Sequence, residues 1–149
     1  RPTWLPPARG VALVWMLAVA LCEAVEELTP LRARLKWPND LLLPATGGAS
    51  HAKAAGILLE ANLGAGRIEW AILGCGVNVS AAPPAAQTRY PATSVAAAAG
   101  APVDRTALLL ALLRRLDAWH GRLQAGEEAA LFAAWRGRLA GIGAPVRVE

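Results

Sequence analysis

Two long apolar runs that meet at a glycine-rich turn constrain this sequence most. The first run, KAAGILLEANLG, ends at Gly64, and the second, RIEWAILGCGVNVS, begins at Arg67. A short glycine-rich connection between two such runs is typical of a β-hairpin. Successive side chains point to opposite faces of a strand, so Ile57 and Leu58 should face opposite sides of this hairpin. The sequence therefore predicts a sheet built around residues 53–78.

The apolar segment from residue 10 to residue 28 has two possible interpretations. It is as long as a signal peptide, but its uncharged part is too short to span a bilayer. Its large apolar residues recur with a helical period, while Glu23, Glu26 and Glu27 lie on other faces. The pattern stops before Pro30. We therefore expect a buried amphipathic helix over residues 10–28 and no membrane segment.

Three further helices are expected after the hairpin. TSVAAAAG is typical of a short capped helix that ends at Gly100. Asp104 can cap a longer helix whose apolar stripe starts at Leu108, and a last helix should cover about 127–139. A helix, then a sheet, then helices in this order predict an α/β (α+β) domain.

Composition and charge exclude several classes of protein. The chain has 149 residues, of which 55% are hydrophobic and 17% charged, which is typical of one globular domain. The net charge of +4 suits an anionic ligand such as a nucleotide, but it is modest for nucleic acid binding. Cys22 and Cys75 form neither a disulfide framework nor a metal-binding spacing, and we expect both in the core. A reducing cytoplasm is the compartment that fits.

The stretch RLKWPNDLLL, residues 34–43, places a cation, an indole, an amide and a carboxylate on one predicted turn. The chain contains only two lysines, Lys36 and Lys53, and its other thirteen basic residues are arginine. Chance in a biased composition would explain the lysines, and WPND by itself could form an ordinary turn. Together with a lysine beside each polar turn, however, the pattern favours a site that handles a nucleotide.

The second apolar run contains two glycines two residues apart, Gly74 and Gly76, with Asn78 continuing the same strand face. Glycine weakens a strand interior, so this pair indicates close approach of a flat or bulky group. The group could be a ligand, or simply a tryptophan packed against the strand. Asn78 can both donate and accept hydrogen bonds, which suits the edge of a nucleobase. Gly56 in the first run also leaves the strand surface open.

The segments KWPNDLLL, KAAGILLE, GCGVNVS and ATS occur in this order, and together they resemble the catalytic domain of biotin protein ligases. The resemblance covers nearly the whole chain, and the combination of motifs is specific although each alone is weak. It implies a mixed β-sheet flanked by helices, related to class II synthetases and lipoate ligases. It also implies a cytoplasmic, ATP-dependent ligase that forms biotinyl-5′-AMP and then biotinylates an acceptor lysine of a biotin carboxyl carrier domain.

The resemblance also implies roles for individual residues. Lys53 would be catalytic and contact the biotin carboxylate and the α-phosphate of ATP, while Lys36 and Trp37 would hold the turn. The nucleotide and its Mg²⁺ would be served by three residues: Asn39, Asp40 as the metal ligand, and Asn78 at the adenine. The wall of the biotin site would be formed by Gly56, Leu58, Gly74 and Gly76.

The sequence departs from the pattern of these ligases in three places. It contains no loop of the form GRGRxGRxW, which closes over biotin and the adenylate. The connection between Asp40 and Lys53 is several residues longer than usual. The final APVRVE begins a strand that the chain does not complete. We therefore expect residues 1–140 to be a partial catalytic domain of a longer protein, and residues 141–149 to begin a small C-terminal β-barrel.

Two alternative functions remain open at this point. A lipoate-type acyl ligase shares the fold, although its motifs lack KWPND. A biotin- or nucleotide-binding remnant without turnover is the second alternative. For the biotin ligase, the expected partners are biotin, ATP and the biotin carboxyl carrier domain of a carboxylase, with a homodimer possible and neither a membrane nor nucleic acid expected.

Overall fold

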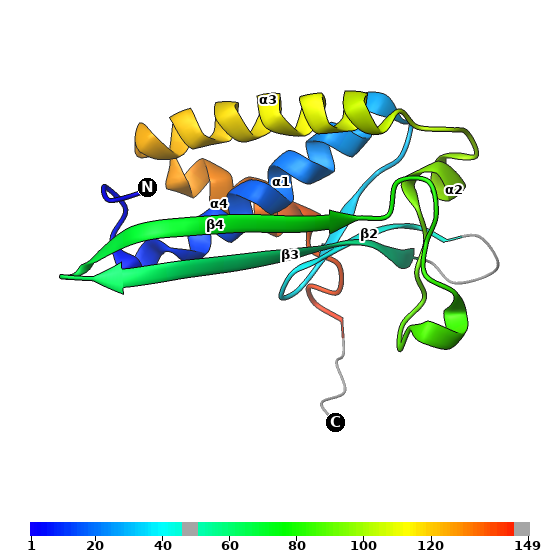
Figure 1. Ribbon diagram of the computed structural model, residues 1–149, viewed down its shortest axis with the longest axis horizontal. Coiled ribbons are helices and arrows are strands. Elements are labelled where there is room, and N and C mark those ends of the chain that lie inside the picture. Colours follow the sequence, from blue (N-terminus) through cyan, green and yellow to red (C-terminus); the bar gives the residue numbers. More distant parts are fainter. Residues whose placement is uncertain (46–50, 145–149) are drawn as a thin grey trace.

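The computed structural model describes residues 1–45 and 51–144, which form a four-stranded antiparallel sheet with helices (Figure 1). The strands lie in the order of the sequence: β1 (Arg34–Lys36), β2 (Asp40–Pro44), β3 (His51–Gly64) and β4 (Arg67–Val77). Parallel pairing enters through two isolated bridges, Leu35 with Leu139 and Lys53 with Ala92. The predicted α+β architecture with a mixed sheet is confirmed.

The predicted hairpin is formed by β3 and β4, the two longest strands. Ala65 and Gly66, the two residues of the turn, both have positive φ angles, of 48° and 75°. This is the backbone geometry of the tight turns whose twist matches that of the flanking strands. As expected, Ile57 is buried and Leu58 is exposed. The hairpin is therefore a double ribbon with one face toward the core and one face open.

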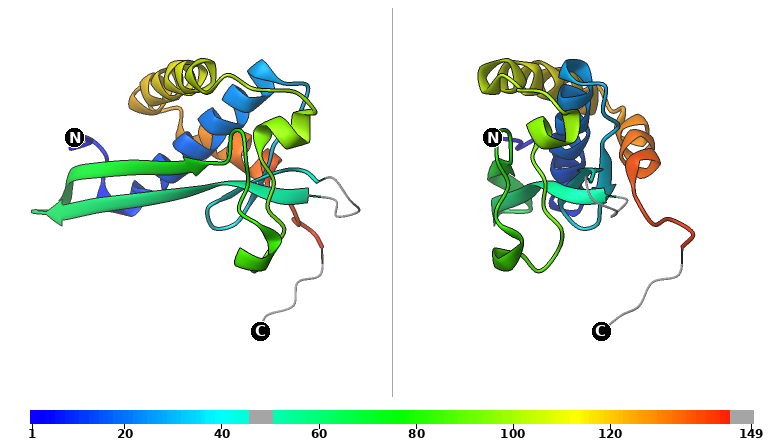
Figure 2. Two further views of the ribbon diagram at one scale, coloured as in Figure 1. Left: turned by 45° about the vertical axis from the view of Figure 1, so that its right-hand side comes forward. Right: turned by 90° about the vertical axis from the view of Figure 1, so that its right-hand side faces the viewer.

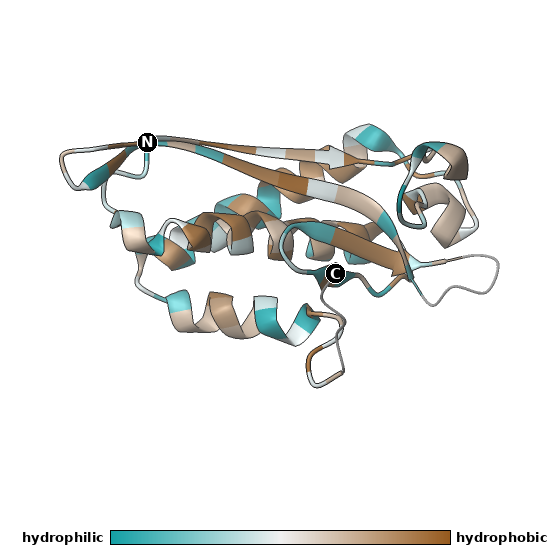
Figure 3. Cartoon of the chain, turned by 90° about the horizontal axis from the view of Figure 1, so that it is seen from below, coloured by the Kyte–Doolittle hydropathy of each residue, from teal (hydrophilic) through white to brown (hydrophobic). Residues whose placement is uncertain are grey.

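The three longest helices cover one face of the sheet (Figures 1 and 2). They are α1 (Val11–Leu28), α3 (Arg105–Gln124) and α4 (Glu128–Arg138), and a fourth helix, α2 (Val95–Ala99), follows β4. Short 3-10 turns lie at Pro7–Arg9 and Ala85–Gln87. Seen from below, none of these three helices lies in front of the hairpin (Figure 3), so among the described residues this face is open except where the segment between β4 and α2 lies against it.

Helix α1 is the centre of the core, as its apolar sequence predicts. Eleven of its residues are buried, from Ala12 to Val25, and it packs against α3, α4 and β3. By length and composition the segment Pro7–Leu28 could cross a membrane, but 67% of its most apolar window is buried inside this fold. Burial on nearly all sides explains its apolar character, because a helix surrounded by other elements needs no polar face.

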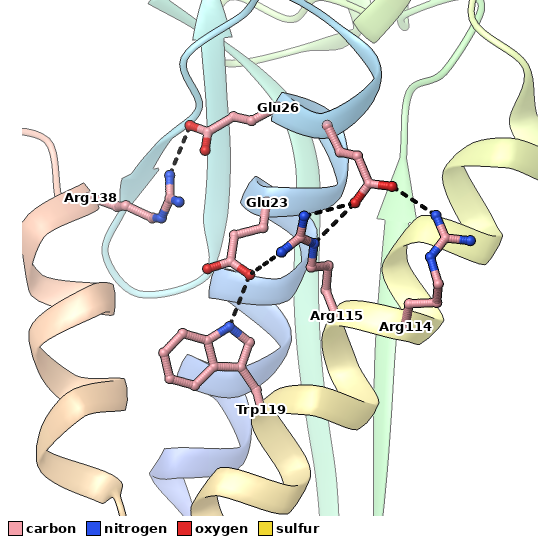
Figure 4. A network of polar contacts seen from close by, with 7 residues as sticks. Glu23, Glu26, Arg114, Arg115, Trp119 and Arg138 are labelled. Atoms are coloured by element: carbon pink, nitrogen blue, oxygen red, sulfur yellow. Dashed lines mark hydrogen bonds and ion pairs between the residues drawn. The ribbon is translucent and has the colours of Figure 1, made fainter.

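The C-terminal end of α1 is joined to α3 and α4 by a network of glutamates and basic residues (Figure 4). Glu23 accepts a hydrogen bond from the Trp119 indole at 3.1 Å, and Glu26 accepts one from Arg138 at 2.8 Å. Glu26 also accepts the backbone N–H of Ala33 at 3.1 Å, just before β1. Glu26, on another face of α1 than the apolar stripe, therefore ties the start of the sheet to this helix.

The predicted helix caps are confirmed. The Ser94 hydroxyl accepts the N–H of Ala97 at the start of α2, and Gly100 ends that helix with a φ of 68°. The Asp104 carboxylate accepts the N–H groups of Thr106 and Ala107 at the start of α3. These side chains satisfy N–H groups that have no partner within the helix.

Two expectations from the sequence need correction. Cys22 is buried as predicted, but Cys75 is exposed, because it lies on the edge strand β4 and opens onto a cavity beside Leu108 and Leu112 of α3. Residues 31–36, LRARLK, alternate apolar and basic side chains, which predicts a strand over the whole segment, but only Arg34–Lys36 pair with β2. The strand expected in APVRVE lies outside the described residues from residue 145 onward.

Candidate functional site

The site is built around Lys53 and Asp40, which lie on neighbouring strands. Opposite Leu41 and Leu42 of β2, strand β3 bulges by one residue, Ala54, so that Leu42 pairs with Lys53 while Asp40 pairs with Gly56. Lys53 Nζ reaches Asp40 Oδ1 at 2.6 Å. That oxygen is buried, and no N–H or O–H among the described residues is oriented to donate a hydrogen bond to it. The ammonium group of Lys53 is thus the counter-charge of a nearly buried carboxylate.

A patch of bare backbone continues from Lys53 along the open face of the hairpin. Gly56 pairs with Gly76, and Leu58 pairs with Gly74, so these predicted wall residues are direct cross-strand neighbours. A Cβ atom added at Gly76 would meet no described atom within 4 Å, and one at Gly74 would meet only the Leu58 carbonyl oxygen, at 3.9 Å. The idea that the glycines admit a packed tryptophan is therefore wrong for this fold.

A pocket of about 290 Å³ opens beside Lys53. Its lining includes three residues predicted for the site besides Lys53: Gly56, Gly76 and Asn78. The pocket approaches the size of cavities that hold small ligands. Leu58 and Gly74 do not line it, but they extend the same bare surface along the strands. The structure thus brings motifs from β3 and β4 together around one cavity.

The two predicted asparagines are both anchored to backbone. Asn39 donates its side-chain N–H to the Ile57 carbonyl at 2.9 Å, and the backbone carbonyl of Asn39 accepts the N–H of Ile57. Asn78 donates its side-chain N–H to the Thr93 carbonyl at 3.1 Å. An amide has a second N–H and a carbonyl oxygen, so each asparagine keeps capacity for a ligand. Asn39 lies in a separate small cleft with Trp37 and Pro38, not in the pocket beside Lys53.

The segment between β4 and α2 contributes residues that the sequence analysis missed. It descends on the open side of the sheet (Figures 1 and 2) and returns beside Lys53. The backbone N–H of Lys53 donates to the Pro91 carbonyl at 2.9 Å, and the backbone carbonyl of Lys53 accepts the N–H of Thr93 at 2.9 Å. Arg89 and Tyr90 consequently line the pocket. The available signal was that Tyr90 is the only tyrosine in the chain, beside an arginine in a loop of prolines and alanines.

Asp40 contacts Lys53 but lines the small cleft of Asn39, and no acidic side chain among the described residues lines the pocket itself. The described residues contain no group of three histidines, cysteines or acidic residues positioned to hold a metal ion. A single carboxylate is nevertheless compatible with Mg²⁺, which is commonly held by one or two carboxylates together with substrate phosphates. The donor set therefore fits a metal that arrives with a nucleotide, and it does not fit a metal bound by the protein alone.

A larger cavity, of about 530 Å³, lies elsewhere, between the N-terminal segment, α1, α3 and β4. Trp4, Leu73 and His120 are among its lining residues, and none of the predicted site residues borders it. Volume alone would select this cavity. The chemistry of Lys53, Asp40 and the glycine surface selects the smaller one.

The chain is similar to curated biotin–[acetyl-CoA-carboxylase] ligases. It is 35% identical to that of Paracoccus denitrificans over 139 residues, which are 90% of this chain and 55% of the relative. It is 36% identical to that of Mycobacterium tuberculosis over 150 residues, which are 98% of this chain and 48% of the relative. The chain thus spans about half the length of these relatives. No protein-family model matches the sequence.

Solved structures show the same likeness. The crystal structure of biotin protein ligase from Aquifex aeolicus matches with a TM-score of 0.73 at 25% identity, covering 93% of this chain and 60% of that one. The same enzyme in complex with biotin and ATP matches with a TM-score of 0.60 at 28% identity, over 79% of this chain and 47% of that one. The sheet and helices described above are therefore the fold of biotin protein ligases.

Proposed function

We propose that this chain, whose homologues over most of its length are biotin–[acetyl-CoA-carboxylase] ligases, supplies the pocket in which biotin is activated by ATP and passed to a protein lysine. The observation that carries the proposal is the position of Lys53. Its ammonium group stands between a bare glycine surface, which a flat ring can approach, and Asp40 at 2.6 Å. This arrangement offers one positive charge at the junction of an apolar and a polar subsite.

The first step joins biotin to AMP. An oxygen of the biotin carboxylate attacks the α-phosphorus of ATP, the bond to the β-phosphate oxygen breaks, and pyrophosphate leaves with the electron pair. Two anions must approach each other in this step, so fixed positive charge is the main requirement. Lys53 would meet it, because an ammonium group has three N–H donors and Asp40 occupies only one side of it.

Asp40 would have two functions in the same step. It holds the Lys53 side chain toward the pocket, and it is the carboxylate that would bind Mg²⁺ together with the phosphates. The metal, when bound, neutralises phosphate charge. The bare surface of Gly56, Gly74 and Gly76, with Leu58 beside it, would receive the rings of biotin because no described side chain fills the space above Gly76.

The second step transfers biotin. The amine of an acceptor lysine attacks the carbonyl carbon of biotinyl-5′-AMP, AMP leaves with the bonding electrons, and the nitrogen loses a proton to give an amide. The acceptor we propose is the lysine of a biotin carboxyl carrier domain, following the name of the curated relatives. The open face of the sheet is the side from which a carrier domain could reach the pocket.

Two measurements test this function. Titration calorimetry with biotin should show binding by the purified protein, and addition of ATP with Mg²⁺ should release pyrophosphate only when biotin is present. Lipoate in place of biotin should give no release, which separates this function from the lipoate-type alternative. Binding of biotin without release of pyrophosphate would instead identify a binding protein without turnover.

A further inference from the structure

Two cations outside the predicted site share the single tyrosine of the chain. Lys36 Nζ lies 4.6 Å from the centre of the Tyr90 ring, and the guanidinium carbon of Arg89 lies 5.8 Å from the same centre. Both contacts are within the usual range of a cation over an aromatic ring. Lys36 comes from the end of β1 and Arg89 from the segment before α2, so the ring joins two separate parts of the chain.

Neither cation has a counter-ion among the described residues. Arg114, Arg115 and Arg138 pair with glutamates of α1, and Lys53 pairs with Asp40, but Lys36 and Arg89 form no ion pair in residues 1–45 and 51–144. Two like charges on one ring repel each other. An anion placed between them would reverse this repulsion, and nothing in the described protein supplies one.

The position of these cations relative to Lys53 is fixed by backbone hydrogen bonds. Pro91 and Thr93 are held to the backbone of Lys53 on the same strand edge. Arg89 and Tyr90 immediately precede Pro91, and both line the pocket that Lys53 lines. A ligand in this pocket therefore meets both Lys53 and Arg89. Lys36 lies just beyond Tyr90.

We propose that Lys36 and Arg89 form a second anion site at the mouth of the pocket, which binds the β- and γ-phosphates of ATP and holds pyrophosphate as it leaves. The inference rests on the proposed function. Lys53 is then free to serve the biotin carboxylate and the α-phosphate. Tyr90 separates the two cations and keeps each beside the phosphate chain. The positive charges of Lys36 and Arg89 beside the departing pyrophosphate stabilise its negative charge and so assist the breaking of its bond to the α-phosphorus.

The charge of the ligand favours a phosphate chain over biotin for this second site. Biotin brings one carboxylate, and Lys53 is the nearest cation to the bare surface that would receive its rings. The β- and γ-phosphates carry several charges, and the planar fork of an arginine can donate two N–H groups to one phosphate. Two unpaired cations therefore match the phosphate chain in charge and in hydrogen-bond donors.

Titration of inorganic pyrophosphate into the purified protein, in low salt, tests the site directly. Calorimetry is performed on the parent and on the Arg89→Gln and Lys36→Gln variants, each with and without Mg²⁺. Each substitution should weaken binding roughly two- to fivefold, as expected of a charge exposed to solvent. The affinity of the parent should fall as salt is added.

Arg67→Gln is the matched control, because Arg67 is an exposed arginine at the distant end of the hairpin. It should bind like the parent.

The possible outcomes separate this inference from the proposed function. Equal pyrophosphate affinity in the parent, Arg89→Gln and Lys36→Gln, or no binding by the parent, overturns the second anion site. A similar loss in Arg67→Gln also overturns it, because general charge would then explain the binding. Biotin affinity, measured in parallel, should be the same in the parent and Arg89→Gln. If biotin does not bind the parent at all, the proposed function fails while the pyrophosphate result still decides on the anion site.

Discussion

The ammonium group of Lys53 is the counter-charge of the nearly buried Asp40 carboxylate. The two side chains meet at 2.6 Å, yet the Asp40 side chain is only 13% exposed whereas that of Lys53 is 42% exposed. The carboxylate has left water and depends on its partner, while the ammonium group retains part of its hydration. A pair with such unequal exposure should respond unequally to the loss of either member.

Lys53→Met should therefore destabilise the fold more than Asp40→Asn. Methionine keeps the aliphatic stem but leaves the Asp40 carboxylate nearly buried without a counter-charge, which should cost about 1–3 kcal/mol in the free energy of unfolding. Asp40→Asn removes the buried charge and leaves an ammonium group that water can reach, so its cost should be below about 1 kcal/mol. Urea unfolding at neutral pH measures both. Equal losses would show that the pair is symmetric after all.

Lys53→Arg should abolish most of the adenylation rate while keeping the fold. Arginine retains the charge, but its planar fork is broader than the ammonium group that fits between Asp40 and the pocket. One electrostatic donor in such a site typically contributes about 10²–10³ in rate, and we expect a loss of that size in biotin-dependent pyrophosphate release. Lys36→Arg keeps its charge beside the Tyr90 ring and should lose much less. Turnover of Lys53→Arg at the parental rate would remove Lys53 from the catalytic role.

The two cysteines should differ sharply in reactivity. Burial raises the pKa of the Cys22 thiol to about 12, while Cys75 is exposed on β4 and has a smaller upward pKa shift from partial burial. Because the thiolate is the reactive form, a disulfide reagent should modify one thiol per folded chain, and faster as the pH rises. Unfolding should expose the second thiol, that of Cys22, to the reagent. Cys75→Ser is the control, and any rapid labelling of that folded variant would contradict the buried position of Cys22.

The contribution of Glu27 to the stability of the fold should depend on pH. Hydrogen bonds from Arg114 and Arg115 hold the pKa of the Glu27 carboxyl below its ordinary value of 4.5. A carboxyl with a lowered pKa in the folded state stabilises the fold above the unfolded pKa, and the effect is lost as the pH falls through the folded pKa. The parent should thus exceed Glu27→Gln in melting temperature at pH 7, and the difference should shrink below pH 4.5. A difference independent of pH would point to packing rather than charge.

The parts of the fold that depend on local pattern could be predicted from the sequence. The hairpin turn at Ala65 and Gly66, the caps Ser94 and Asp104 and the buried helix α1 all follow from residue spacing and turn chemistry. Cys75 was misplaced because the exposure of a side chain on an edge strand depends on which helix packs over that part of the sheet. An apolar run does not reveal how far a helix covers the face of its strand.

The candidate site was predictable only where the residues lie within motifs. Lys53, Gly56, Gly76 and Asn78 do converge on one pocket. The contact of Lys53 with Asp40 depends on a bulge in β3 at Ala54, and the approach of Arg89 and Tyr90 depends on backbone hydrogen bonds made after a loop of more than ten residues. Neither contact leaves a periodic signal in the sequence, since both arise from long-range pairing.

Gly76→Ala separates packing from ligand binding at the bare surface. An added methyl group meets no described atom within 4 Å, so the substitution should leave the free energy of unfolding unchanged or raise it by about 0.5 kcal/mol, because alanine has less freedom than glycine in the unfolded chain. The same methyl group would project into the space proposed for biotin. It should weaken biotin binding by about 1–3 kcal/mol, the usual cost of overpacking a fitted surface.

Gly121→Ala on α3 is the control, since it also meets no described atom within 4 Å but lies on an exposed helix away from the site. Calorimetry with biotin and urea unfolding of both variants give the answer. Biotin affinity that is equal in the parent, Gly76→Ala and Gly121→Ala would place biotin elsewhere, because a ligand lying against β4 could not avoid that methyl group.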